Sequence, residues 1–126
     1  MPTTDRLRTM FVSQINRFSK DSRVMLDGDA EALQYLDALD TMITVSPDLV
    51  SAFFFENIGK PYYSKIMDRD EEFLTTKLTD TIGAGPFGDL YKKIIDRWET
   101  LTEKNRNIIW DYFTVLTKIS QKLSSS

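Results

Sequence analysis

The last part of the chain carries an apolar pattern with the period of an α-helix, and this feature constrains the fold most. Large apolar side chains recur there three and four positions apart, so they fall on one face of a helix. These residues are Ile108, Ile109, Tyr112, Phe113, Leu116, Ile119 and Leu123. The pattern predicts a long C-terminal helix with a wide apolar stripe, and Thr102 is its expected cap.

The beginning of the chain shows the same spacing and predicts an N-terminal helix. Its apolar positions are Leu7, Met10, Phe11, Ile15 and Phe18. Thr4 is the expected cap, and the helix is expected to end near Phe18 because the stretch from Ser19 to Asp29 is mainly polar. Gly28 indicates a turn within that stretch.

Two further helices are predicted between Asp29 and Gly59. Asp29 is a suitable N-cap for the first of them. The apolar stripe of this helix is Ala30, Leu33, Leu36, Leu39, Met42 and Ile43. Ser46 followed by Pro47 is a typical helix start, and Gly59 is expected to end this next helix through a left-handed cap. The expected inward positions of the latter helix are Leu49, Val50, Phe53 and Phe54.

The middle of the chain predicts short helices and one clear break. Pro61 is expected to open a short helix, and Asp68 or Asp70 is expected to cap another that ends before Ile82. Segment 83–88 contains three glycines and a proline, so it is predicted to be a loop between helices. The apolar positions of the next helix are Leu90, Tyr91, Ile94, Trp98 and Leu101.

These patterns together predict the fold class. A chain of 126 residues has the usual size of one domain, and its 41% of hydrophobic residues are enough for one core. No segment shows the alternation of a strand over a useful length. We therefore expect an all-α protein, a single compact bundle of five to seven helices over residues 1–126, with 83–88 as a glycine-rich loop between helices.

Cysteine and histidine are both absent from the chain. The first absence excludes disulfides, thiolate nucleophiles and cysteine-based metal sites. The second removes the commonest general base and transition-metal ligand, so a Ser–His–Asp or Cys–His arrangement is impossible. We find no other catalytic machinery, and we expect a protein that is not an enzyme and that uses no cofactor or metal.

Two motifs resemble ligand sites but have simpler interpretations. Gly83, Gly85 and Gly88 have the spacing of a dinucleotide-binding loop, but that loop follows a buried strand, and the residues before Gly83 are too polar for one. A linker between helices is the preferred interpretation, and an anion site at the next helix start is the alternative. The acids of Asp68–Glu72 are interpreted as a solvated helix start rather than a cation site.

Charge is distributed unevenly along the chain. From Met1 to Arg23 there are five basic and two acidic residues, whereas from Val24 to Gly59 there are seven acidic residues and no basic one. The preferred interpretation is that the two segments pair within the monomer or are solvated. The alternative is that the basic first helix meets an acidic partner, or the acidic segment of a second copy. A net charge of −3 argues against nucleic acid as a partner.

No run of apolar residues approaches the length of a membrane-spanning helix, so no membrane insertion is expected. The charged N-terminus is unlike a secretory signal. Together with the absence of cysteine, this predicts a cytoplasmic location.

Some aromatic residues are candidates for partner binding. Three consecutive phenylalanines end with Phe55, and three consecutive helix positions span about 200°, so Phe55 is expected at the edge of the core. Aromatic side chains at the surface commonly anchor a protein partner. Trp110 lies off the line of the C-terminal stripe and is the better surface candidate of the two tryptophans. We take Phe55, Tyr63, Phe87 and Trp110 as the candidate partner-binding residues.

Two segments in the second half of the chain resemble small helical proteins of nucleocytoplasmic large DNA viruses, including viruses that infect algae. The first is Pro61–Leu74, with the acidic turn Asp68–Glu72. The second is Trp98–Phe113, in which the cap Leu101–Thr102 leads into the aromatic run Ile109–Tyr112. The resemblance implies a viral origin and a location in the host cytoplasm or the virion. It implies no activity and no catalytic residue.

The leading hypothesis is a non-enzymatic helical protein–protein interaction or assembly module, such as a minor virion component or a virus-encoded adaptor. Its partner would be another protein or a second copy, docked through apolar side chains and oriented by charge. Two alternatives stay open. One is a nucleic-acid-associated accessory protein that uses the basic N-terminal helix, and the other is a small-ligand or phosphate-binding protein that uses the glycine-rich loop.

Overall fold

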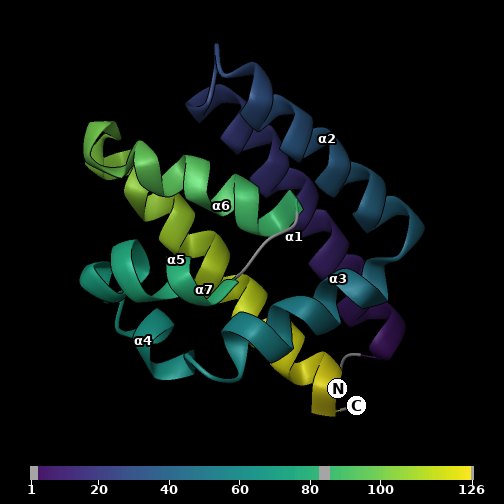
Figure 1. Ribbon diagram of the computed structural model, residues 1–126. Helices are drawn as coiled ribbons and strands as arrows, with labels where there is room; N and C mark the ends of the chain where they lie inside the picture. Colours follow the sequence, from purple (N-terminus) through teal and green to yellow (C-terminus); the bar gives the residue numbers. More distant parts are fainter. Residues whose placement is uncertain (1–2, 83–85, 126) are drawn as a thin grey trace.

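Helices account for all regular secondary structure in the computed structural model, which describes residues 3–82 and 86–125. This confirms the predicted all-α bundle (Figure 1). The α-helices in these ranges are α1 (Thr4–Met25), α2 (Ala30–Val45), α3 (Pro47–Phe54), α4 (Tyr63–Met67), α5 (Leu78–Ile82), α6 (Pro86–Asp96) and α7 (Glu103–Ser125). Two π-helical segments, η1 (Phe55–Gly59) and η2 (Phe73–Lys77), and a 3-10 turn, η3 (Trp98–Thr100), complete them.

The two longest helices, α1 and α7, lie side by side in opposite directions, so both ends of the chain lie close together (Figure 1). The rings of Phe18 and Tyr112 meet edge to face across this pair, with centroids 5.6 Å apart. The Tyr112 hydroxyl also donates a hydrogen bond to the Asp21 carboxylate. The apolar stripe of α7 faces the core as predicted, and Phe113 and Leu116 are buried.

α2 folds back along α1, and α6 packs against α2. Gly28 forms the turn between α1 and α2 with a φ of 86°, a conformation that side chains disfavour. Asp29 caps α2 as predicted, because its carboxylate accepts a hydrogen bond from the Ala32 N–H at 3.0 Å. The same carboxylate lies 3.6 Å from the Lys93 amine and 3.6 Å from the Arg97 guanidinium, so it joins the start of α2 to α6.

Caps predicted from sequence are confirmed at two other helix starts. Thr102 and Asp70 each accept a hydrogen bond from the N–H three residues ahead, at 3.1 Å and 3.0 Å. The N-cap of α1 is Thr3 rather than the predicted Thr4. Its hydroxyl accepts a hydrogen bond from the N–H three residues ahead at 3.2 Å.

α1 also runs to Met25, beyond its predicted end near Phe18. Ser19 and Ser22 are buried and continue the inner face of the helix toward the turn at Gly28. Their small side chains fit a helix interface, although their polarity made the stretch look like a linker.

The glycine-rich segment 83–88 is not a loop over its whole length. Residues 83–85, with Gly83 and Gly85, lie outside the described residues. α6 begins at Pro86, so Phe87 and Gly88 are helical. Proline suits a first helical position because it has no N–H that would need a partner there.

Gly59 ends the π-helical segment η1 and does not form the predicted left-handed cap. Among the glycines that the structure describes, Gly28 is the one with a positive φ. A methyl group at Gly59 would lie 3.3 Å from the Ser120 hydroxyl oxygen and 3.6 Å from a Thr117 methyl, both on α7. A side chain here would make a tight contact with α7, because η1 approaches that helix closely.

Replacing Gly59 with alanine is expected to destabilise the protein by about 1–3 kcal/mol, because the new methyl presses on the Ser120 oxygen. In a Ser120→Ala background the cost is expected to fall, since that oxygen is gone. Urea denaturation of the wild type, both single variants and the double variant measures this coupling. An equal cost in both backgrounds would contradict the close-approach explanation.

Candidate interaction surface

The orientation of α3 is fixed by one buried ring. Phe54 is 1% exposed, and its ring meets those of Phe11, Phe87 and Phe113, with centroids 6.2, 6.3 and 6.3 Å away. Val50, one turn earlier, is buried on the same face. Because successive helix residues are rotated by about 100°, the residues that precede these two positions are turned away from the core.

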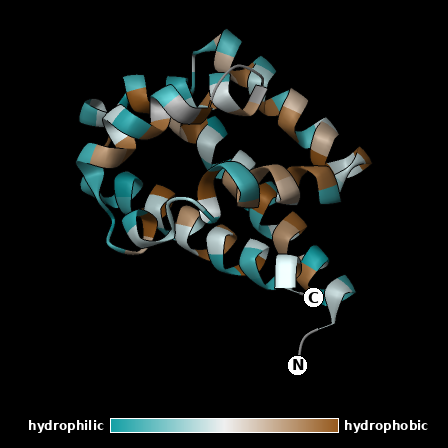
Figure 2. Cartoon of the chain, turned by 60° about the horizontal axis from the view of Figure 1, so that its bottom comes forward, coloured by the Kyte–Doolittle hydropathy of each residue, from teal (hydrophilic) through white to brown (hydrophobic). Residues whose placement is uncertain are grey.

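Exposed apolar residues gather where α2 meets α3. Met42 is 41%, Val45 74%, Leu49 70% and Phe53 37% exposed. The half-buried Phe87 extends the group onto α6, since its ring centroid is 5.9 Å from that of Phe53. Figure 2 shows hydrophobic residues on both ribbons at this bend, at the right of the view. We call these five residues the apolar corner.

The position of the apolar corner corrects the sequence prediction, which directed Met42, Leu49 and Phe53 inward. α3 has only eight residues, and the chain bends by 113° between α2 and the run Pro47–Gly59. Only one flank of so short a helix reaches the core, and Val50 and Phe54 occupy it. Single exposed apolar residues are normal, but a contiguous group of them is typical of a docking surface.

The rim of the apolar corner is acidic. Four of the five corner residues lie in the segment from Val24 to Gly59, which has seven acidic residues and no basic one. Asp48, which pairs with Arg8, and Glu56 are exposed on α3 and η1, and Asp89 lies in the first turn of α6. An apolar surface with this rim favours a partner surface that combines apolar and basic groups.

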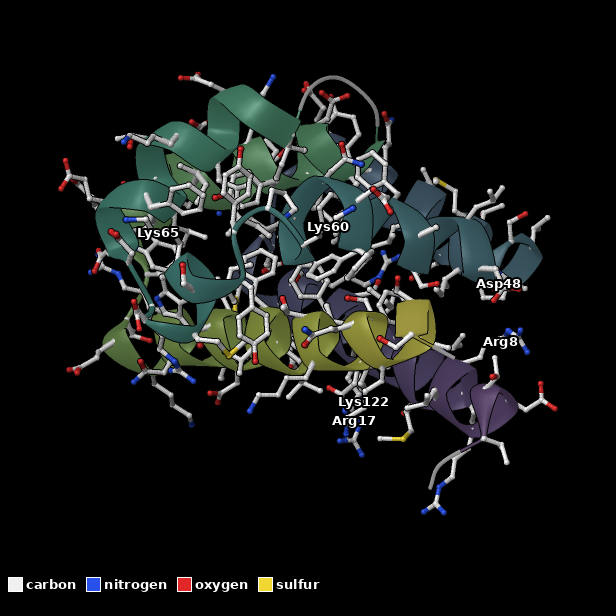
Figure 3. The ribbon with its side chains drawn as sticks, turned by 90° about the horizontal axis from the view of Figure 1, so that it is seen from below. Arg8, Arg17, Asp48, Lys60, Lys65 and Lys122 are labelled. Carbon is white, nitrogen blue, oxygen red and sulfur yellow. The ribbon has the colours of Figure 1, made fainter. Side chains whose placement is uncertain are left out.

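The basic part of α1 pairs in part with the acidic segment, as the preferred interpretation of the charge pattern predicted. Arg8 Nε lies 2.6 Å from Asp48 Oδ1, and the two side chains point toward one another in Figure 3. Arg23 lies 2.7 Å from Asp37 and 2.6 Å from Asp40. Hydrogen bonding to Asp48 is the main cause that raises the pKa of Arg8. These exposed pairs attach α1 to α2 and α3, each contributing little free energy.

The four candidate partner-binding residues do not form one surface. Phe87 belongs to the apolar corner, whereas the half-buried Phe55 lines a groove of about 260 Å³ between α1, α3 and α7. Tyr63 is 39% exposed on α4. Trp110 is 4% exposed, because η3 covers this side of α7 and brings Trp98 edge to face with it, centroids 6.4 Å apart. Burial removes Trp110 from the candidate surface.

The acidic run Asp68–Glu72 has structural roles. Asp70 caps a helix, and Glu71 accepts a hydrogen bond from the Trp98 indole at 2.6 Å and lies 3.4 Å from the Arg106 guanidinium. Over residues 3–82 and 86–125, no three Asp or Glu side chains are grouped closely enough to hold a metal ion. The anion site considered as the alternative for the glycine-rich segment involves residues 83–85, which lie outside the described residues.

The hydropathy of α2 and α3 is high for surface helices. Within the described ranges, no single helix is long and apolar enough to span a membrane. α2 and the run Pro47–Gly59 reach that hydropathy only as a pair, across their 113° bend. The pair carries both core residues and the apolar corner.

Comparison with known proteins gives no match to a family model, to a curated protein or to a solved structure. Inferences about function therefore depend on the surface of this chain. The apolar corner is the part of that surface from which the inference is drawn.

The contact between Tyr112 on α7 and Asp21 on α1 is expected to make the stability of the protein fall at alkaline pH. Burial, reinforced by the hydrogen bond to Asp21, raises the pKa of Tyr112 to about 12. In the unfolded chain the Tyr112 hydroxyl ionises at a lower pH than in the folded protein. The stability that this hydroxyl contributes below about pH 10 is therefore lost as the pH rises toward about 12. A Tyr112→Phe variant is expected to lose less stability across this window in denaturant titrations.

The matched control is Tyr63→Phe on α4, which is expected to follow the wild type. If the free energy of unfolding of the wild type and of Tyr112→Phe has the same pH dependence, the raised pKa of Tyr112 is contradicted.

Proposed function

We propose that the protein is a non-enzymatic assembly module that binds a second copy of itself through the apolar corner. The observation that carries the proposal is the exposure of Val45 and Leu49, at 74% and 70%, beside Met42 and Phe53. Removing apolar surface from water is favourable by roughly 25 cal/mol per Å², so such a group gains free energy when a partner covers it.

A second copy is the preferred partner because one chain carries both halves of an electrostatic match. Four of the five residues of the apolar corner lie in the acidic segment 24–59, and the first helix is basic. Asp37, Asp40 and Asp48 of this segment pair within the monomer, whereas Glu56 forms no ion pair with a basic residue of the described ranges. Arg8 and Arg23 are used in ion pairs within the monomer. Arg6, Arg17 and Lys20 form no ion pair with an Asp or Glu of the described residues, so they are available to acids of another molecule.

The geometry of the apolar corner also favours association, because binding would cost little conformational entropy. Val45 and Leu49 flank a short helix–helix corner rather than a long loop, and Phe54 holds α3 against three other helices. A surface held in place before binding loses little conformational freedom on binding. Covering the aliphatic side chains would supply affinity, and the acidic rim would determine the orientation in which the partner binds.

In the setting that the viral resemblance implies, such a module is a minor virion component or a virus-encoded adaptor in the host cytoplasm. This part of the proposal rests on the segments Pro61–Leu74 and Trp98–Phe113 alone. Self-association does not depend on that setting and can be tested on the purified chain.

The double variant Val45→Gln, Leu49→Gln is expected to weaken self-association by about tenfold or more, because it removes the two most exposed aliphatic side chains of the apolar corner. Glutamine favours helices, so both substitutions are expected to leave α2 and α3 folded. Sedimentation velocity over a wide concentration range measures association, and circular dichroism checks folding.

Val24→Gln is the matched control, since it removes an aliphatic side chain that is 76% exposed near the end of α1, at the opposite end of α2 from the apolar corner. It is expected to associate like the wild type. A wild type that stays monomeric at every concentration would overturn the proposal, as would unchanged association of the double variant. If the wild type is monomeric but floats with phosphatidylcholine vesicles, and the double variant does not float, the apolar corner is a membrane surface instead.

A further inference from the structure

Methionine is the one sulfur-containing residue type of this chain, because cysteine is absent. Of the four methionines that the structure describes, Met25 and Met67 are half-buried, whereas Met10 and Met42 are exposed. The exposed fractions of Met10 and Met42 are nearly equal, at 43% and 41%. A thioether on the surface of a protein is open to oxidation by peroxide. The two exposed sulfurs are therefore similar in accessibility, and they differ in where they lie.

Met42 is the sulfur-containing member of the apolar corner. It lies three positions before Val45 on α2, so the two side chains project from the same side of that helix. Leu39 and Ile43 are buried and hold α2 on the core. A chemical change at the Met42 sulfur is therefore expected to alter the apolar corner and to leave the packing of α2 intact.

Met10 lies on α1, outside the apolar corner. The buried residues Leu7 and Phe11 hold α1 on the core on either side of it. Met10 thus matches Met42 in exposure and in secondary structure, but it has no place in the proposed contact. The chain itself provides the control for an effect of oxidation at Met42.

We propose that Met42 is an oxidation site through which peroxide reversibly weakens docking at the apolar corner. This inference rests on the proposed self-association. One oxygen of hydrogen peroxide bonds to the thioether sulfur, the O–O bond breaks, and the other oxygen leaves with both hydrogens as water. The sulfur is oxidised by two electrons and the peroxide is reduced. The product, methionine sulfoxide, is polar, and methionine sulfoxide reductases convert it back to methionine.

The sulfoxide oxygen makes the oxidised corner less suited to docking. In the free molecule water donates hydrogen bonds to this oxygen. In the contact it would be covered among Val45, Leu49 and Phe53, whose side chains offer no donor. Removing a polar group from water without a hydrogen-bond partner is unfavourable. Oxidation of Met42 therefore favours the separate molecules, and reduction restores the apolar surface.

Docking is expected to protect Met42 in turn, because a partner that covers the apolar corner keeps peroxide from the sulfur. In dilute wild-type protein, where the molecules are separate, the nearly equal exposures predict comparable rates of oxidation at Met10 and Met42. As the concentration rises and the molecules associate, oxidation of Met42 is expected to slow relative to that of Met10. Peptide mass spectrometry measures the sulfoxide at each position.

The second measurement compares Met42→Leu with the matched control Met10→Leu. Leucine is apolar and close to methionine in volume, so both variants are expected to fold and to associate like the wild type before treatment. After treatment with hydrogen peroxide, the wild type and Met10→Leu are expected to associate about tenfold more weakly in sedimentation velocity. Met42→Leu is expected to keep its association. Treatment of the oxidised wild type with the reductases for both sulfoxide epimers is expected to restore it.

The outcomes distinguish this inference from the proposed function. Absence of sulfoxide at position 42 in dilute protein, or unchanged association of a wild type that carries it, overturns the inference and leaves self-association standing. An equal loss of association in Met42→Leu and Met10→Leu also overturns it, and so does oxidation of Met42 that does not slow as the wild type associates.

The protection and recovery measurements use the wild type alone, so they decide the inference even if Met42→Leu fails to fold. A wild type that is monomeric at every concentration before treatment overturns the proposed function itself.

Discussion

The packing of Phe54 against three other rings determines where the exposed surface of this protein lies. Phe11, Phe87 and Phe113 approach it from α1, α6 and α7, so elements far apart in the chain fix the rotation of α3. Once Phe54 is inside, Phe53 is turned outward by about 100°. Phe87 contacts both rings and therefore connects the core to the apolar corner. The candidate interaction surface is thus a consequence of the core.

The helices and most of their starts could be predicted from the sequence, because they depend on local rules. The stripe of α7 is wide and regular, so its period identifies the helix without knowledge of the neighbours. Asp29, Asp70 and Thr102 cap helices because each offers a side-chain oxygen to the N–H groups ahead. Such contacts involve residues within one turn of each other, and the sequence displays them directly.

The rotation of α3 could not be predicted in the same way, because its sequence offers two overlapping apolar faces. Leu49 and Phe53 form one and Val50 and Phe54 the other, and only the rings of distant helices select between them. Long-range packing also explains Gly59, whose role is set by α7 rather than by its own turn. Trp110 is buried because η3 covers it. In each case the deciding neighbour is distant in sequence.

The same helical period that builds the core also sorts the charges of α1. At about 100° per residue, Arg8 and Arg23 fall on the flank that faces α2 and α3, and there they pair with Asp48, Asp37 and Asp40. Arg6, Arg17 and Lys20 form no ion pair with an Asp or Glu of the described residues, so a chain with a net charge of −3 keeps a locally basic face there. Burial of apolar surface stabilises a contact between proteins but does not fix its orientation. Separated charges fix the orientation of a contact but add little to its free energy. The apolar corner and the basic outer flank of α1 therefore suit different parts of a contact, the first its free energy and the second its orientation.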